Sequence, residues 1–149
     1  MKKFKYSMES ILQINIKLED KARNNYSSAR NRLTEEEERL DQIIIRKNTY
    51  EDELRQLRSM KLDLFKIKEC EQAIELMEEK KQEQANIVRN AENRLEIARI
   101  RLSTAMIERK TQDKLKENAW AEYLEEYEAE QQKEVDELNS FSYSKEELT

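Results

Sequence analysis

The sequence predicts an all-α protein, a long two-helix antiparallel coiled-coil hairpin, and three observations support this fold class. The 149 residues include no glycine and no proline, the two residues that helix interiors reject and tight turns favour. Charged residues make up 41% and apolar residues 37% of the chain, with a mean hydropathy of −1.07, which is typical of a coiled coil and poor for a globular core. Apolar residues also recur at steps of three and four, which argues against disorder.

The first helix is expected over residues 5–58. Between residues 11 and 57, 11 of 14 positions spaced by three and four are apolar, so one side of this helix forms a seam. The step from Leu18 through Ala22 to Tyr26 is four plus four. Such a stutter would locally unwind a supercoil.

A short turn over residues 59–63 and a second helix over residues 64–139 are expected to follow. Asp63 predicts the start of the second helix, because aspartate is favoured at N-caps. From Ile74 to Tyr123, 10 of 15 positions at strict heptad spacing are apolar. Residues 140–149 lose this pattern and are expected to fray. Together the two helices, the turn and this tail are predicted to form one coiled-coil rod over residues 1–149.

The charge distribution favours a monomeric hairpin over a single helix of about 200 Å paired in a parallel dimer. Residues 117–149 contain 11 acidic and 2 basic residues, a net charge of −9, whereas residues 89–116 have a net charge of +4. A hairpin centred near residue 62 places the lysine-rich N-terminus beside Glu122–Glu130. A parallel dimer would instead bring the two acidic C-terminal stretches together.

The composition argues against an enzyme and against a metal or cofactor site. The chain has no histidine, the commonest general base and metal ligand, and its single cysteine, Cys70, has no histidine to pair with. The run Glu35–Glu38 has no EF-hand loop, and Glu35 precedes Arg39 by four residues, so we interpret it as a solvated face. We expect no catalytic residue, cofactor or metal.

Nucleic acid and membrane insertion are also disfavoured. The basic stretch 89–116 contains no stacking aromatic, and the isoelectric point is about 5.1. No apolar run approaches the ~18–20 residues that span a bilayer, and the basic start of the chain is followed by no signal-peptide apolar region. A cytoplasmic protein is expected.

Two apolar groups are candidate protein interfaces. The first lies in the acidic part of the second helix, where it either anchors a partner or packs on Ile11, Leu12 and Ile14: Trp120, Tyr123, Leu124 and Tyr127. The second lies near the turn, where it forms a docking surface or simply closes the rod: Phe65, Ile67, Cys70, Ile74 and Met77. Three polar residues interrupt the seam of the second helix and are expected either to weaken pairing or to contact Asp20, Asn24 and Asn25: Arg109, Gln112 and Lys116.

The two ends of the chain carry a resemblance to a known family. Residues 3–12, with the order basic, aromatic and then aliphatic, resemble the opening of the FliJ family, a soluble component of the flagellar type III export apparatus. Residues 108–110, 114–117 and 130–138 resemble its closing segment, with the Glu-Gln-x-Lys-Glu-x-Asp-Glu pattern the strongest part. The length and the two breaker-free helices are similar too.

The resemblance implies a non-enzymatic protein similar to the central stalk of rotary ATPases. Such a protein binds the hexameric flagellar export ATPase, promotes its ring assembly and activity, contacts the membrane subunit of the export gate, and escorts export chaperones. It implies a cytoplasmic protein recruited to the cytoplasmic face of the cell membrane at the flagellar base, with a role in flagellum biogenesis, motility and chemotaxis. An injectisome stalk homologue and a homodimeric structural coiled-coil spacer remain the alternatives.

The resemblance also implies two sets of site residues. The open end of the hairpin, carrying both termini, would enter the ATPase ring through Phe4, Tyr6, Leu12, Trp120, Tyr123, Tyr127, Val135 and Leu138. The export-gate and tip patch would comprise Ile43, Tyr50, Cys70, Ile74 and Met77. Arg46 and Cys70 stand where some relatives carry aromatic residues, a departure that affects the gate patch.

Overall fold

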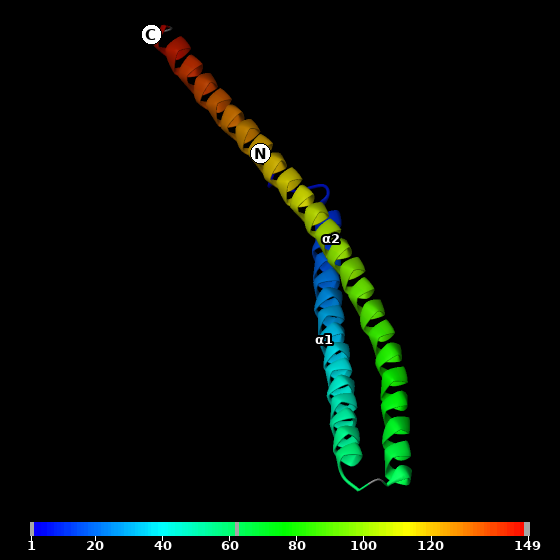
Figure 1. The fold of residues 1–149 in the computed structure, drawn as a ribbon. Coiled ribbons are helices and arrows are strands. Elements are labelled where there is room, and N and C mark those ends of the chain that lie inside the picture. The colour runs from blue at the N-terminus through cyan, green and yellow to red at the C-terminus, as the bar shows by residue number, and fades with distance from the viewer. Residues whose placement is uncertain (1, 62, 148–149) are drawn as a thin grey trace. The chain divides into compact units, whose positions relative to one another are not determined.

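The structure, a computed structural model, describes residues 2–61 and 63–147. Two helices, α1 (Glu9–Ser59) and α2 (Leu64–Glu147), make up nearly all of these residues, and no strand occurs among them. The helices are joined by one short connection and pack on each other in antiparallel orientation (Figure 1). The all-α fold class with a two-helix antiparallel hairpin is confirmed. Within the described ranges, neither helix has a stretch long and apolar enough to cross a membrane.

The start of α1 lies at Glu9, four residues later than the sequence predicts. The amide of Glu9 donates to the carbonyl of Tyr6 at 3.2 Å, and the amide of Leu12 donates to the carbonyl of Met8 at 3.1 Å. Residues 2–6 stay outside the helix, which leaves Phe4 and Tyr6 free to reach α2. The predicted start near residue 5 is therefore wrong, because these aromatic side chains are used in contacts with α2.

The turn forms without glycine. Asp63 caps α2, since its Oδ1 accepts from the Lys66 amide at 3.3 Å and its carbonyl accepts from the Ile67 amide at 3.1 Å, as the sequence predicts. No described residue has a positive φ, so the described residues on both sides of the turn adopt no left-handed conformation. An ion pair of 3.2 Å between Arg58 and Glu71 joins the two helices next to the turn.

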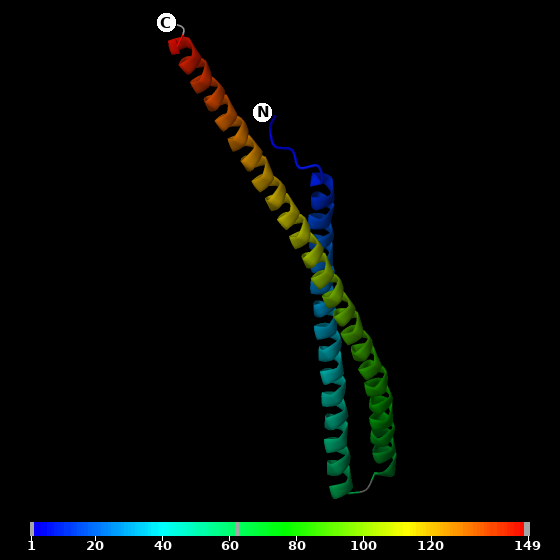
Figure 2. The ribbon, with the colours of Figure 1, turned by 90° about the horizontal axis from the view of Figure 1, so that it is seen from above.

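The far end of α2 also differs from expectation. Residues 140–147 are helical, where the sequence predicts a frayed tail. The apolar pattern ends there, but residues 140–147 include no glycine or proline to stop the helix. Every described residue after Tyr123 is exposed, so this segment is an extension of α2 past its pairing with α1, as Figure 2 shows. A lost seam removes packing without ending a helix.

The chain divides into two compact units. The terminal unit combines Met1–Asp20 with Thr104–Thr149, and the hairpin unit comprises Lys21–Ser103. Both helices contribute to each unit. The single rod over residues 1–149 stays a prediction.

The core of α2 follows the predicted heptads closely. Its buried residues recur every seven positions: Cys70, Met77, Gln84, Ala91, Ala98 and Ala105, with Val88 between them. All of these except Cys70 belong to the predicted seam. Alanine at three consecutive heptad positions shortens the side chains that face α1, which allows close approach of the two backbones.

The register of α1 differs from the prediction near its start. Leu12 and Glu19 are buried, whereas Ile11 and Leu18 are 43% and 48% exposed. With Leu12 and Glu19 on the seam, the spacing through Ala22 keeps alternating steps of three and four, so the predicted stutter is absent. Counting apolar residues favoured Leu18 because a buried glutamate is rare; Glu19 is accommodated by an ion pair with Arg109 in the terminal unit.

Candidate binding surfaces

An aromatic cluster joins the N-terminal segment to α2 in the terminal unit. The ring of Phe4 packs edge-on against Trp120 at 5.0 Å between centroids and lies 5.4 Å from Tyr123. Tyr123 stacks between Trp120 at 5.5 Å and Tyr127 at 6.3 Å. Its hydroxyl donates to the carbonyl of Lys2 at 2.9 Å. These contacts resemble interface-type aromatic pairs in geometry, and they fasten an otherwise irregular segment to a helix.

The cluster is only half covered. Trp120 and Tyr127 remain 45% and 41% exposed, and Leu124 is 38% exposed. A shallow groove of about 380 Å³ lies alongside, with lysines of the N-terminal segment on one wall and Glu122 and Glu126 on the other. The predicted placement of the basic N-terminus beside these acids agrees with this groove. A half-exposed aromatic surface beside charged residues is a suitable anchor for a protein partner.

The three polar residues on the seam of α2 pair within the terminal unit. Arg109 forms ion pairs with Glu19 and Asp113, the Tyr6 hydroxyl donates to Gln112 Oε1 at 3.3 Å, and Lys116 lies 2.8 Å from Glu9 Oε2. The prediction that these side chains contact Asp20, Asn24 and Asn25 is wrong, because their partners are Glu19, Tyr6 and Glu9. The reason is the register of α1, which turns Glu19 and not Asp20 toward α2.

Of the eight residues predicted for the ATPase-binding end, the structure brings five together. Phe4, Trp120, Tyr123 and Tyr127 form the ring cluster, and Tyr6 contacts α2 through Gln112. Leu12 is 3% exposed and belongs to the core, so its side chain supports the surface from below. Val135 and Leu138 are 47% and 66% exposed on the α2 extension.

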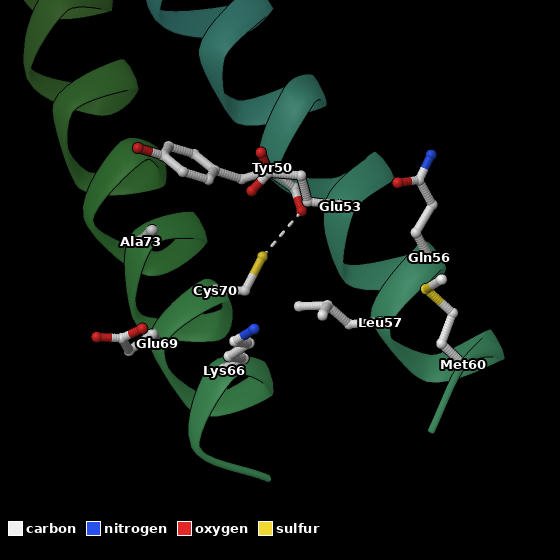
Figure 3. A pocket seen from close by; sticks show the side chains of 9 residues that line it. All are labelled: Tyr50, Glu53, Gln56, Leu57, Met60, Lys66, Glu69, Cys70 and Ala73. Atoms are coloured by element: carbon white, nitrogen blue, oxygen red, sulfur yellow. Dashed lines mark hydrogen bonds between the residues drawn. The ribbon is translucent and has the colours of Figure 1, made fainter. Parts of the chain in front are cut away.

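A pocket of about 520 Å³ lies next to the turn in the hairpin unit. Figure 3 shows Leu57 and Cys70 between the two helices, with the Cys70 thiol donating to the Tyr50 carbonyl at 3.1 Å. Burial raises the pKa of this thiol, with help from nearby Glu53 and Glu71, so it stays protonated and unreactive. Three apolar residues around the turn are 72–76% exposed: Met60, Leu64 and Phe65.

The five residues predicted for the gate and tip patch have mixed exposure. Cys70 and Met77 are buried, at 6% and 5%, and hold α2 against α1. Ile43, Tyr50 and Ile74 are half-buried. A partner at this patch would therefore contact the last three and their exposed neighbours, with Cys70 and Met77 as support.

Sequence reasoning missed the most buried side chain among the described residues. Glu36, assigned to a solvated face, is 1% exposed. Its Oε2 accepts from Gln84 Nε2 at 2.6 Å, and its Oε1 pairs with Arg39 at 2.7 Å and with Arg32 at 3.1 Å. Gln84 also donates to the Glu36 carbonyl at 3.0 Å. The position of Glu36 on the seam, between Leu33 and Leu40, was the signal that could have identified it as buried.

Cross-helix ion pairs make the fold sensitive to pH. Lys116, with help from Gln13, holds the pKa of Glu9 below its ordinary value of 4.5, and Lys47, with help from Gln82, does the same for Glu78. Glu78 in turn raises the pKa of Lys47 above 10.5. The carboxylates contribute stability that is present above pH 4.5 and lost as the pH falls through their folded pKa values, whereas Lys47 contributes stability that is lost as the pH rises through its raised pKa.

We therefore expect the thermal midpoint of unfolding to decrease when the pH is lowered below about 4.5. Glu78→Gln should make this decrease smaller. Melting curves followed by circular dichroism at a series of pH values would measure it. Glu79→Gln, at an exposed neighbouring position, is the matched control. An unchanged acid dependence in Glu78→Gln would show that the pair with Lys47 contributes nothing.

Together the fold and these surfaces define a two-helix coiled-coil protein with exposed apolar surfaces that are candidate binding surfaces; the described residues include no cluster that could hold a metal ion. Over residues 4–148 the sequence matches the family described as Flagellar FliJ protein. The chain belongs to the FliJ family, whose members are components of flagellar type III export.

The fold also resembles that of a solved structure. The structure is similar to that of a putative YscO homolog from Chlamydia trachomatis, with a TM-score of 0.76, 23% identity and coverage of 99% of both chains. This likeness shows the fold. No curated protein matches the sequence.

Proposed function

We propose that this protein is a non-enzymatic, stalk-like component of flagellar type III export that binds the export ATPase ring through its terminal unit and promotes ring assembly and activity. Membership of the FliJ family supports the setting. The observation that carries the binding role is the half-exposed aromatic cluster on an acidic helix. A half-exposed aromatic cluster is better explained by contact with a partner protein than by packing within the chain.

The binding surface comprises the cluster and the α2 extension. Phe4, Trp120, Tyr123 and Tyr127 supply area at low entropy cost, with Tyr6 and Leu12 fixing the N-terminal segment. Val135 and Leu138 continue the apolar contact along the extension. Binding to one ring conformation in preference to others would shift the ATPase toward it.

The hairpin unit would link the ring to the export gate, and export chaperones would bind the same rod. Ile43, Tyr50 and Ile74 offer partly exposed apolar area for the gate, supported by Cys70 and Met77. In this proposal the protein works as a cytoplasmic monomer, recruited to the membrane face at the flagellar base by its partners.

The test is the rate of ATP hydrolysis and the ring assembly of the cognate export ATPase with and without this protein. We expect stimulation that saturates near one rod per hexamer, because a central stalk fills a single axial site. No binding and no stimulation by a folded chain would contradict the proposal. A dimer measured by light scattering would favour the alternative of a homodimeric spacer.

A second candidate is a stalk homologue of an injectisome, favoured by the shared fold with the putative YscO homolog. The same assay with an injectisome ATPase separates the two, since only the cognate ATPase should respond at near-stoichiometric amounts.

A further inference from the structure

A groove of about 630 Å³ lies between α1 and α2 in the hairpin unit. Its apolar lining combines Met77, which is buried, Ile43, which is half-buried, and Ile45, which is 63% exposed. Arg39, Arg46 and Lys80 complete the lining with cationic side chains. We call this feature the Arg39–Lys80 groove.

The charge of this groove is not balanced within it. Its described lining includes no acidic residue, whereas the pocket at the turn and the groove beside the N-terminal segment each contain acidic and basic residues. Arg39 pairs with Glu36, but Arg46 and Lys80 form no ion pair with any described residue. The lining of the groove therefore has a net positive charge, in a chain whose net charge is −5.

A second feature is the exposure of Ile45. Its neighbours Ile43 and Ile44 are half-buried, whereas Ile45 is exposed and is not needed for pairing with α2. Ile45 lines the groove together with the cationic residues. An apolar floor with a cationic rim matches a ligand that presents apolar and acidic side chains together.

We propose that the Arg39–Lys80 groove binds an acidic linear segment of a partner protein, which inserts an apolar side chain against Ile43, Ile45 and Met77. This proposal rests on the proposed function, because Ile43 and Met77 belong to the gate patch. It adds the chemistry of the partner that binds at that patch. A concave site suits a peptide better than a flat bilayer, whose anionic surface the net charge of −5 would repel. Nucleic acid is disfavoured, since no aromatic side chain lines the groove.

The probe is a fluorescein-labelled synthetic peptide of roughly 15 residues that repeats Glu-Glu-Leu, long enough to fill a groove of this kind. Matched peptides replace every Glu by Lys or every Leu by Ser. With the full-length protein we expect fluorescence anisotropy to report binding of the Glu-Glu-Leu peptide alone, weakening as salt is raised. Arg46→Glu with Lys80→Glu should weaken binding at least tenfold, and Ile45→Ser severalfold.

The control is Arg89→Glu with Lys110→Glu, the same charge change at two exposed positions of α2 outside the groove, and it should bind normally. Circular dichroism would verify equal helicity in all variants. Absence of binding to the unmodified protein, or binding that Arg46→Glu with Lys80→Glu leaves unchanged, overturns the proposal.

Two other occupants would also overturn it. Tighter binding of a peptide copying residues 128–147 of this chain, together with dimers in sedimentation, would assign the groove to a second copy. Groove-dependent binding of phosphatidylglycerol vesicles without peptide binding would assign it to a lipid surface.

ATPase stimulation by the same preparations separates this inference from the proposed function. Stimulation without peptide binding would defeat the groove proposal alone. Groove-dependent peptide binding without stimulation would support the groove and defeat the stalk proposal.

Discussion

Replacing Glu36 by alanine is expected to lower the free energy of unfolding by about 3 kcal/mol. The substitution removes the acceptor of Gln84, which is 8% exposed, and leaves its amide nitrogen in the interior with one bond to a carbonyl. The side chains of Arg32 and Arg39 are more than half exposed, so water solvates them once Glu36 is removed. The expected loss of stability therefore lies near the lower end of the range for breaking a buried ion pair. Thermal unfolding should shift by roughly 6–12 °C.

The double variant Glu36→Leu with Gln84→Leu should recover most of this loss, because two apolar side chains replace a paired polar layer without leaving either partner alone. Glu35→Ala, at an exposed position one residue away, should change stability by less than about 0.5 kcal/mol. Equal small effects of Glu36→Ala and Glu35→Ala would show that the Glu36 network contributes nothing to the fold.

Replacing Trp120 and Tyr127 together by alanine is expected to weaken binding to the export ATPase by about 2–4 kcal/mol, roughly 30-fold to 1000-fold in affinity. Both rings keep more than two fifths of their surface exposed, so a partner would cover area that the chain itself leaves open. Their helix continues on both sides without a break. Titration calorimetry against the ATPase would measure the affinity, and circular dichroism the helicity.

Phe65→Ala is the matched control, since it removes a 72% exposed aromatic side chain from the turn of the hairpin unit. It should leave ATPase binding unchanged. Loss of helicity in step with loss of binding in the Trp120 and Tyr127 variant would show that the two rings are core residues of the terminal unit.

Much of the fold could be predicted from composition and spacing. Lack of glycine and proline and an apolar residue every three or four positions specify helices and their seams. Asp63 marked the start of α2, and the heptads of α2 identified Met77, Ala91, Ala98 and Ala105 as core. These features depend on local backbone preference and on repeated apolar contact, both of which a linear sequence records.

The candidate sites were less accessible from the sequence. The sequence identified the aromatic residues of the terminal unit but left open whether they form a partner surface or pack internally. Phe4 and Tyr123 pack on each other while Trp120 and Tyr127 keep exposed area. How much of a ring is covered depends on where the N-terminal segment lies, and no periodicity governs an irregular segment.

Composition and spacing were enough to predict that this chain forms two paired helices, and its ends and layout resemble the FliJ family. The tertiary structure alone decided which charges are buried: Glu36 against Gln84, and Glu19 against Arg109. It also decided that the helix of residues 140–147 persists beyond its pairing. The physical reason is that a charged side chain enters a seam only when a partner from a distant part of the chain meets it, and that meeting is a property of the register between helices.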